Sequence, residues 1–139
     1  MNTPYLSVVV PCYNEHENLA HNVLEEMHAY LSRQPYSYEV IISDDGSSDN
    51  SREIVQERLP GLPQFRLLQN PHGGKPAAVW SGIQAARGEI VLFTDMDQST
   101  PIDQLELLLP RFAAGYLVVI GSRGQDRANF SLFRKMGSA

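Results

Sequence analysis

The sequence predicts an α/β protein in which a mostly parallel, Rossmann-like sheet carries helices on both of its faces. Short apolar runs rich in Val, Ile and Leu alternate with longer stretches whose apolar residues recur at helical spacing. Groups of Gly, Pro, Asn, Asp and Ser separate these segments. Parallel strands need long crossover connections, which are usually helices. The alternation therefore indicates a largely parallel sheet between two helical layers.

Five segments have the composition of β-strands. They are residues 6–10, 39–43, 65–68, 89–94 and 116–120. Turn-forming residues follow each of these runs, as expected where a strand ends at the edge of a sheet. We expect Pro11 to close the first strand, because proline has no N–H group to donate to a sheet ladder.

Four segments between the strands have helical periodicity. They cover about residues 15–33, 50–58, 76–87 and 100–112. Asn14, followed by Glu17, resembles the cap of the first helix. One face of that helix carries Leu19, Val23, Met27 and Leu31. The segment 129–139 is also amphipathic, which predicts a terminal helix or the continuation of a longer chain.

Length, charge and cysteine content exclude several classes of protein. The 139 residues are enough for one domain with a hydrophobic core. The formal charge of −5 argues against a nucleic-acid binder, and a single cysteine, Cys12, excludes an internal disulfide. No apolar run approaches the roughly 20 residues of a membrane helix, and we recognise no signal peptide. We therefore expect a soluble, cytoplasmic protein.

The paired acids Asp95 and Asp97 follow the strand predicted at 89–94. Residues two apart in an extended segment point the same way, roughly 7 Å apart by strand geometry. Two carboxylates so placed can share Mg²⁺ or Mn²⁺, with substrate phosphates completing the coordination shell. The alternative is a solvated turn after a strand, which needs no ligand.

Two further groups of residues follow the second and third strands. Asp44 and Asp45 precede Gly46, and one of them could accept hydrogen bonds from a nucleobase or ribose. Lys75 follows two glycines at a predicted helix N-terminus, where free N–H groups favour a diphosphate. The alternatives are an Asx-type turn for the acids and an exposed surface lysine.

The last candidates are basic residues near the end of the chain. Arg123, Arg134 and Ser138 could form a second anion site, because arginine binds phosphate through two parallel hydrogen bonds. The alternative is a scatter of surface arginines. The four histidines lack the spacing of metal ligands, so the sequence assigns them no role.

Taken in order, these motifs resemble family 2 glycosyltransferases over nearly the whole chain. They are Val8–Glu15, Asp44–Asp49, Lys75 with Ala78, Asp95–Asp97 and Gly121–Arg123. Within the family, the chain is similar to polyprenyl- or dolichyl-phosphate mannosyl- and glucosyltransferases. Their acceptor phosphate is held by arginines that match Arg123 and Arg134, with Ser138 four residues later.

The resemblance implies a GT-A fold that uses a nucleotide-diphosphate sugar of the UDP-glucose or GDP-mannose type. Residues 1–139 would then be the nucleotide-sugar-binding part of a domain that continues beyond this chain. Asp95 and Asp97 would position Mg²⁺ or Mn²⁺, and the resemblance makes Asp97, Lys75 and Arg123 the catalytic residues. The nucleotide would contact Pro11, Tyr13, Glu15, Asp44, Asp45, Lys75 and Asp95.

The reaction implied is an inverting, metal-dependent transfer of a hexose to a polyprenyl phosphate, at the cytoplasmic face of a membrane. A lipid phosphate is largely ionised at neutral pH, so it needs no general base, unlike a hydroxyl acceptor. In place of the Leu-Gln that relatives often carry after the paired acids, this chain has Gln98 and Ser99. The third metal ligand therefore stays open.

Three other functions are compatible with parts of the pattern. The acceptor could be a saccharide hydroxyl, or the chain could be an inactive fragment that binds nucleotide and metal. A phospho-receiver-like domain also gathers acids and a lysine at a sheet edge. That class predicts an aspartate after the third strand and a lysine after the fifth, where this chain has Gln69-Asn70 and Arg123.

Overall fold

A computed structural model describes residues 3–98, 102–113, 116–121 and 130–134. The chain divides into two compact units, Met1–Ser99 and Thr100–Ala139. All but three of the residues predicted for the site lie in the first unit. Arg123, Arg134 and Ser138 lie in the second unit, and of these three Arg134 alone is among the described residues.

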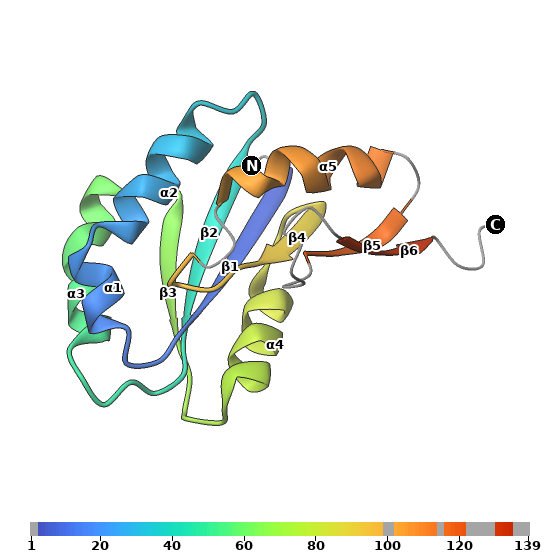
Figure 1. The fold of residues 1–139 in the computed structure, drawn as a ribbon. Helices are drawn as coiled ribbons and strands as arrows, with labels where there is room; N and C mark the ends of the chain where they lie inside the picture. The colour runs from blue at the N-terminus through green and yellow to red at the C-terminus, as the bar shows by residue number, and fades with distance from the viewer. Residues whose placement is uncertain (1–2, 99–101, 114–115, 122–129, 135–139) are drawn as a thin grey trace. The chain divides into compact units, whose positions relative to one another are not determined.

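The first unit is built on a four-stranded sheet in the order β3-β2-β1-β4 (Figure 1). Its strands are β1 (Leu6–Cys12), β2 (Tyr38–Asp44), β3 (Phe65–Gln69) and β4 (Ile90–Phe93). All three pairings are parallel. Every residue of β1 is buried, as a central strand covered on both faces should be. The predicted parallel α/β sheet is therefore confirmed.

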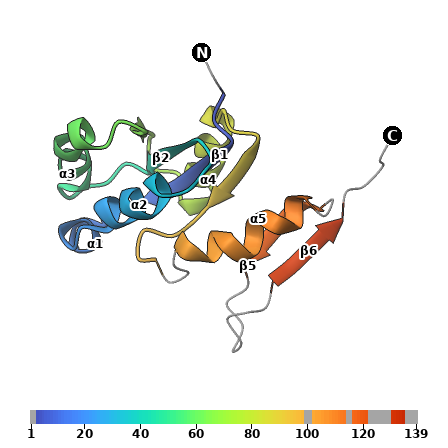
Figure 2. The ribbon, with the colours of Figure 1, turned by 90° about the horizontal axis from the view of Figure 1, so that it is seen from above.

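Helices connect the strands and cover both faces of the sheet. They are α1 (His16–Ala20), α2 (Val23–Ser32), α3 (Ser51–Arg58) and α4 (Lys75–Ala85), with a 3-10 turn η1 (Leu59–Gly61) after α3. Figures 1 and 2 show α1, α2 and α3 on one side of the sheet and α4 on the other. Right-handed crossovers require this arrangement, because the chain reverses its direction across the sheet after β3. The predicted helical layers on both faces are confirmed.

Two predicted boundaries in this unit were wrong. β1 continues through Pro11 to Cys12, and Pro11 pairs in register with Ser43 of β2. On its other side the neighbouring β4 ends at Phe93, opposite Val9. Among the described residues, Pro11 therefore has a paired strand only on the side of β2. A proline is tolerated there, since its missing N–H group costs no ladder bond to β4.

The helix predicted over residues 15–33 is two helices, α1 and α2. Asn22 separates them with a φ of 62°, in the left-handed region that Asn adopts more readily than most residues. The break preserves the predicted apolar face. Its four members are all buried, namely Leu19, Val23, Met27 and Leu31.

Helix α4 lies close against the centre of the sheet. Gly82 has no side chain where it meets Val9 of β1: a Cβ atom there would lie 2.3 Å from a Val9 methyl carbon. The Ser43 hydroxyl of β2 donates to the Ala78 carbonyl over 2.7 Å. These contacts hold the helix that begins with Lys75, and so they determine where that lysine stands.

A buried acid anchors the far end of α4. The Glu39 carboxylate of β2 accepts a 2.6 Å hydrogen bond from the Ser7 hydroxyl and a 2.7 Å bond from the Arg87 amide. Arg66 of β3 lies 3.2 Å from the same carboxylate and also donates to the Ala85 carbonyl. Burial would raise the pKa of Glu39, but these hydrogen bonds and the Arg66 charge lower it below the ordinary value.

The second unit contains η2 (Ile102–Gln104), α5 (Leu105–Ala113), β5 (Tyr116–Gly121) and β6 (Phe130–Arg134). β5 and β6 pair antiparallel in a two-stranded sheet. Of the two alternatives given for residues 129–139, the terminal helix is wrong over Phe130–Arg134, which form a strand. Its apolar positions fit both periodicities over so few residues, and the neighbouring strand β5 provides the hydrogen-bond partners that select a strand. No helix in the described part of the chain could span a membrane.

Candidate active site

The carboxyl ends of β1, β2, β3 and β4 meet at one edge of the sheet, because the four strands are parallel. Ligands of open α/β sheets bind at this edge. The strand ends, loops and helix start at this edge carry the predicted site residues of the first unit, namely Tyr13, Glu15, Asp44, Asp45, Lys75, Asp95 and Asp97. Pro11, the remaining one, is buried inside β1.

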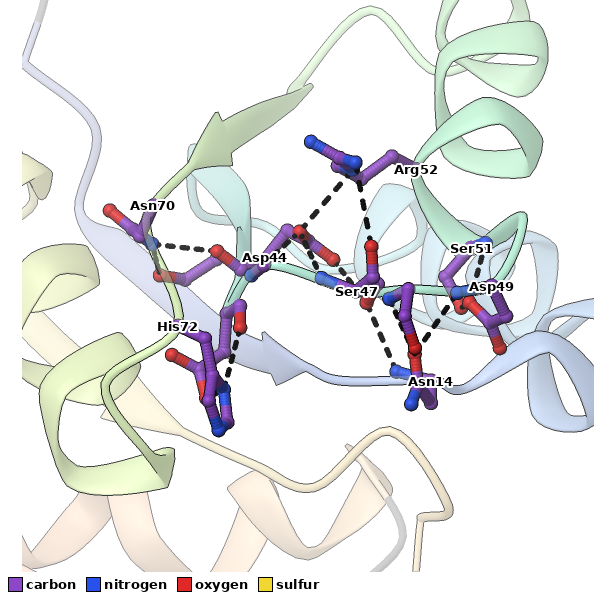
Figure 3. A network of polar contacts seen from close by, with 12 residues as sticks. Asn14, Asp44, Ser47, Asp49, Ser51, Arg52, Asn70 and His72 are labelled. Carbon is purple, nitrogen blue, oxygen red and sulfur yellow. Dashed lines mark hydrogen bonds and ion pairs between the residues drawn. The ribbon is translucent and has the colours of Figure 1, made fainter.

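Asp44 stabilises the turn that follows β2 (Figure 3). Its Oδ2 accepts hydrogen bonds of 3.0 Å from the amides of Gly46 and Ser47, and its Oδ1 accepts from the Ser47 hydroxyl at 2.6 Å. Arg52 Nε lies 3.7 Å from Oδ2. The Asp44 side chain is buried, so these contacts stabilise the turn and are not exposed to solvent. A nucleotide role for Asp44 stays a prediction.

Asn14 joins the loop after β1 to the loop after β2. Its Oδ1 accepts hydrogen bonds from the amides of Ser48 at 2.9 Å and Asp49 at 3.2 Å (Figure 3). Its own amide donates to Ser47 Oγ over 3.0 Å. The predicted helix cap was wrong, because Asn14 has a φ of 52° and the capping position of α1 is Glu15. Asn14 is an organising residue of the site edge instead.

Glu15 and Asp49 complete this junction. The Glu15 amide donates to the Ser51 hydroxyl over 2.9 Å, and that hydroxyl donates to Asp49 over 2.6 Å. Burial would raise the pKa of Asp49, but the Ser51 hydrogen bonds and His16 lower it below the ordinary value. Asp49 therefore holds the start of α3, because its carboxylate also accepts a hydrogen bond from the Ser51 amide at 2.9 Å.

Asp45 binds the loop between β3 and α4. Its two carboxylate oxygens accept hydrogen bonds from the amides of Gly73 at 2.9 Å and Gly74 at 3.0 Å. His72 Nδ1 lies 3.0 Å from the same carboxylate. Gly74 adopts a φ of 96°, which brings consecutive amides toward one acceptor. The acid side chain is 4% exposed, so it is both buried and well supplied with donors.

Tyr13 and His72 form a stacked pair of rings at this edge. Their centroids are 4.6 Å apart and their planes differ by 25°. Tyr13 is 44% exposed and is one of the largest exposed apolar groups among the described residues. Sequence analysis assigned His72 no role, because the histidines lack the spacing of metal ligands. Its place in the loop after β3 was the signal available.

Lys75 and Asp95 are brought together from the start of α4 and the end of β4. The Lys75 ammonium forms an ion pair with the Asp95 carboxylate. The Asp95 carbonyl accepts hydrogen bonds from the Gln98 amide at 3.0 Å and from its side-chain Nε2 at 2.8 Å. Asp97 is exposed in the same turn. The edge therefore offers a cation and two carboxylates to a ligand.

Cys12 lies directly beneath this edge but has no reactive character. Burial raises the pKa of its thiol to about 12, and the charges of Asp44 and Glu15 add to the effect. The thiolate is the nucleophilic form, so the chain holds this cysteine in its unreactive state. It is the last residue of β1 and is buried.

The side-chain contacts described above do not involve the three residues of the predicted acceptor-phosphate site. Arg123 and Ser138 lie outside the described residues. Arg134 is the last residue of β6, where it pairs in register with Tyr116. The roles of these three residues stay predictions.

The family of the chain follows from its sequence. Residues 7–138 match the family described as Glycosyl transferase family 2. The chain belongs to this family. It is 38% identical over 146 residues to a dolichyl-phosphate beta-glucosyltransferase of Trichomonas vaginalis, covering 94% of this chain and 43% of that protein. It is also 35% identical to an undecaprenyl-phosphate 4-deoxy-4-formamido-L-arabinose transferase of Edwardsiella ictaluri, covering 96% of this chain and 41% of that one.

Solved structures support the same fold. A mannosyltransferase from Pyrobaculum calidifontis, in complex with GDP-Man and Mn²⁺, superposes with a TM-score of 0.64 at 26% identity. The match covers 87% of this chain and 36% of that one. TarS of S. aureus, in complex with UDP-GlcNAc, gives a TM-score of 0.57 at 26% identity over 88% of this chain and 36% of its own. The GT-A fold is therefore confirmed, in a chain that spans about two fifths of the curated relatives above.

Proposed function

We propose that the protein containing this chain transfers a hexose from a nucleotide-diphosphate sugar to a polyprenyl phosphate. The observation that carries this proposal is the convergence of Lys75, Asp95 and Asp45 at the ligand-binding edge of a family 2 glycosyltransferase. Two relatives are named for transfer to dolichyl or undecaprenyl phosphate, which supports the acceptor class. The donor is of the UDP-glucose or GDP-mannose type.

Each half of the edge has its own part in donor binding. Tyr13, Asp45 and Glu15 hold the nucleoside, and the buried Pro11 and Asp44 support the loops that carry these residues. Lys75 neutralises the diphosphate, because an ammonium at a helix N-terminus sits where anions are favoured. Arg123, Arg134 and Ser138 hold the acceptor phosphate; of these, Arg123 and Ser138 lie outside the described residues.

The carboxylates of Asp95 and Asp97 are suitable ligands for Mg²⁺ or Mn²⁺. Both are hard carboxylates on one turn, and the buried Oε1 of the neighbouring Gln98 has no hydrogen-bond partner among the described residues. No group of three or more His, Cys, Asp or Glu side chains in the described ranges is placed to hold a metal. Such ions are commonly bound by one or two carboxylates with substrate phosphates and water, so this set is sufficient. When bound, the ion supplies positive charge to the diphosphate.

The reaction needs few groups from the protein. An ionised oxygen of the acceptor phosphate forms a bond to the anomeric carbon, and the bond from that carbon to the diphosphate breaks. The electron pair leaves with the nucleoside diphosphate. Because the acceptor oxygen bonds to the face opposite this leaving group, the configuration at the carbon inverts. Lys75 faces the charge that develops on this leaving group and stabilises it. Since the acceptor is already ionised, no proton has to be removed.

Calorimetry with the chain itself tests the donor site. UDP-glucose and GDP-mannose are titrated with and without Mn²⁺ into the wild type, Asp97→Ala and the control Glu57→Ala, which removes an exposed acid of α3. We expect binding of one donor that requires Mn²⁺, is lost in Asp97→Ala and is unchanged in Glu57→Ala. A folded wild type that binds neither donor would contradict the proposal. The protein that contains this chain could also bind the donor and transfer its sugar only to saccharide hydroxyls. That result would support the donor site and contradict the proposed polyprenyl-phosphate acceptor.

A further inference from the structure

We propose that His72 is a positioning residue for the nucleobase of the donor. It holds the Tyr13 ring and the Asp45 carboxylate in the arrangement that receives the base. This inference rests on the proposed function, since it assumes that a nucleotide occupies the edge of the sheet. It concerns a histidine for which the sequence pattern offered no role.

The first support is the ring geometry. Tyr13 and His72 stack with centroids 4.6 Å apart, and both are substantially exposed, Tyr13 at 44% and the His72 side chain at 57%. A stacked pair favours one orientation of each ring. His72 therefore fixes the plane of Tyr13 and leaves part of that ring open to a flat ligand.

The second support is the hydrogen bonding of Asp45. His72 Nδ1 lies 3.0 Å from both the carboxylate and the backbone carbonyl of Asp45. The Gly73 and Gly74 amides donate to the same carboxylate. An ionised carboxylate offers about four acceptor positions, so these three donors leave about one for an N–H group of a base. His72 thus orients the acid without using all of its capacity.

The third support is the space made for His72 by its neighbour. Gly46 adopts a φ of 74°, and a Cβ atom at this position would lie 2.8 Å from the His72 amide nitrogen. The turn after β2 therefore lets the loop after β3 approach closely. His72 therefore links its own loop to the loops after β1 and β2, through Tyr13 and Asp45. No other residue of the three loops combines a ring contact with a contact to a buried acid among the interactions described here.

The two contacts of His72 can be removed one at a time. His72→Phe retains a ring to stack on Tyr13 and loses the contact to Asp45. His72→Asn retains a side-chain N–H group for Asp45 and loses the ring, while His72→Ala loses both. The matched control is His21→Asn, which changes an exposed histidine at the end of α1.

The experiment measures the dissociation constants of UDP and GDP, with Mn²⁺, for each variant. We expect the wild type to bind one of the two nucleotides more tightly. His72→Phe and His72→Asn should each raise the dissociation constant of that nucleotide by about three- to tenfold. His72→Ala should raise it further. The dissociation constant of the other nucleotide should change less, so the ratio of the two constants falls. The thermal midpoints of the His72 variants and the nucleotide binding of His21→Asn should stay at wild-type values.

Three results would overturn the inference. If the variants weaken both nucleotides equally with a lowered thermal midpoint, His72 has a structural role alone. Unchanged binding in His72→Ala would exclude any role in the site. If the folded wild type binds neither nucleotide, the proposed function itself fails and the inference fails with it, which distinguishes this case from the other two.

Discussion

Helix α4 carries Lys75 to the site, and the contact of Gly82 with Val9 determines how closely that helix lies on the sheet. We predict that Gly82→Ala destabilises the chain, although alanine is the better helix former. Glycine inside a helix costs about 1 kcal/mol relative to alanine. If helix propensity were the dominant effect, the variant would be more stable than the wild type.

The structure predicts the opposite sign. The new Cβ atom would lie 2.3, 3.1 and 3.3 Å from three carbons of Val9, whereas carbons in contact normally stand roughly 3.5–4.0 Å apart. Val9 is fully buried in a central strand, and its branched side chain has few alternative rotamers. Overpacking of this kind costs about 1–3 kcal/mol and here exceeds the gain in propensity. We expect a net loss of about 1–2 kcal/mol.

Urea unfolding of a double-mutant cycle measures this effect. Val9→Ala removes the two methyl groups that clash and should itself cost about 2 kcal/mol. The double variant should then lose less than the sum of the two single variants, with a coupling of about 1 kcal/mol or more. Gln84→Ala, on the exposed face of α4, is the control. A Gly82→Ala variant that is more stable than the wild type, or costs that simply add, would refute the reasoning.

Two further predictions follow from the buried titratable groups. The pKa of Glu39 is lowered in the folded state, so its contribution is complete above the unfolded value of about 4.3 and is lost as the pH falls through the folded pKa. Urea midpoints measured from pH 7 to pH 3 should therefore fall on acidification, and less steeply in Glu39→Gln; parallel curves would contradict this. With a thiol pKa of about 12, Cys12 should not react with a thiol reagent at pH 8 until urea unfolds the chain. Rapid modification of the native protein would show that the thiol is accessible.

Much of the candidate site could be predicted from sequence because its residues follow strands. Parallel strands bring their carboxyl ends to one edge, which is why the acids that follow strands were candidates. Lys75 pairs there with Asp95, 20 positions away, and the roles of both residues in donor binding stay predictions. Which of two adjacent acids stabilises the turn and which binds the neighbouring loop was not predictable. Asp44 and Asp45 differ only in the direction that the backbone gives each carboxylate.

The sequence by itself determined the parallel α/β class, the apolar faces of its helices and the family, because each depends on local periodicity or on the order of short motifs. Tertiary structure alone decided what two residues and one segment do. Asn14 bonds to a loop 34 positions away instead of capping a helix, His72 reaches Tyr13 and Asp45, and Phe130–Arg134 becomes a strand beside β5. In each case the partner is distant in sequence. A local sequence pattern does not show which distant residues come into contact, because those contacts form only when the sheet and its loops pack together.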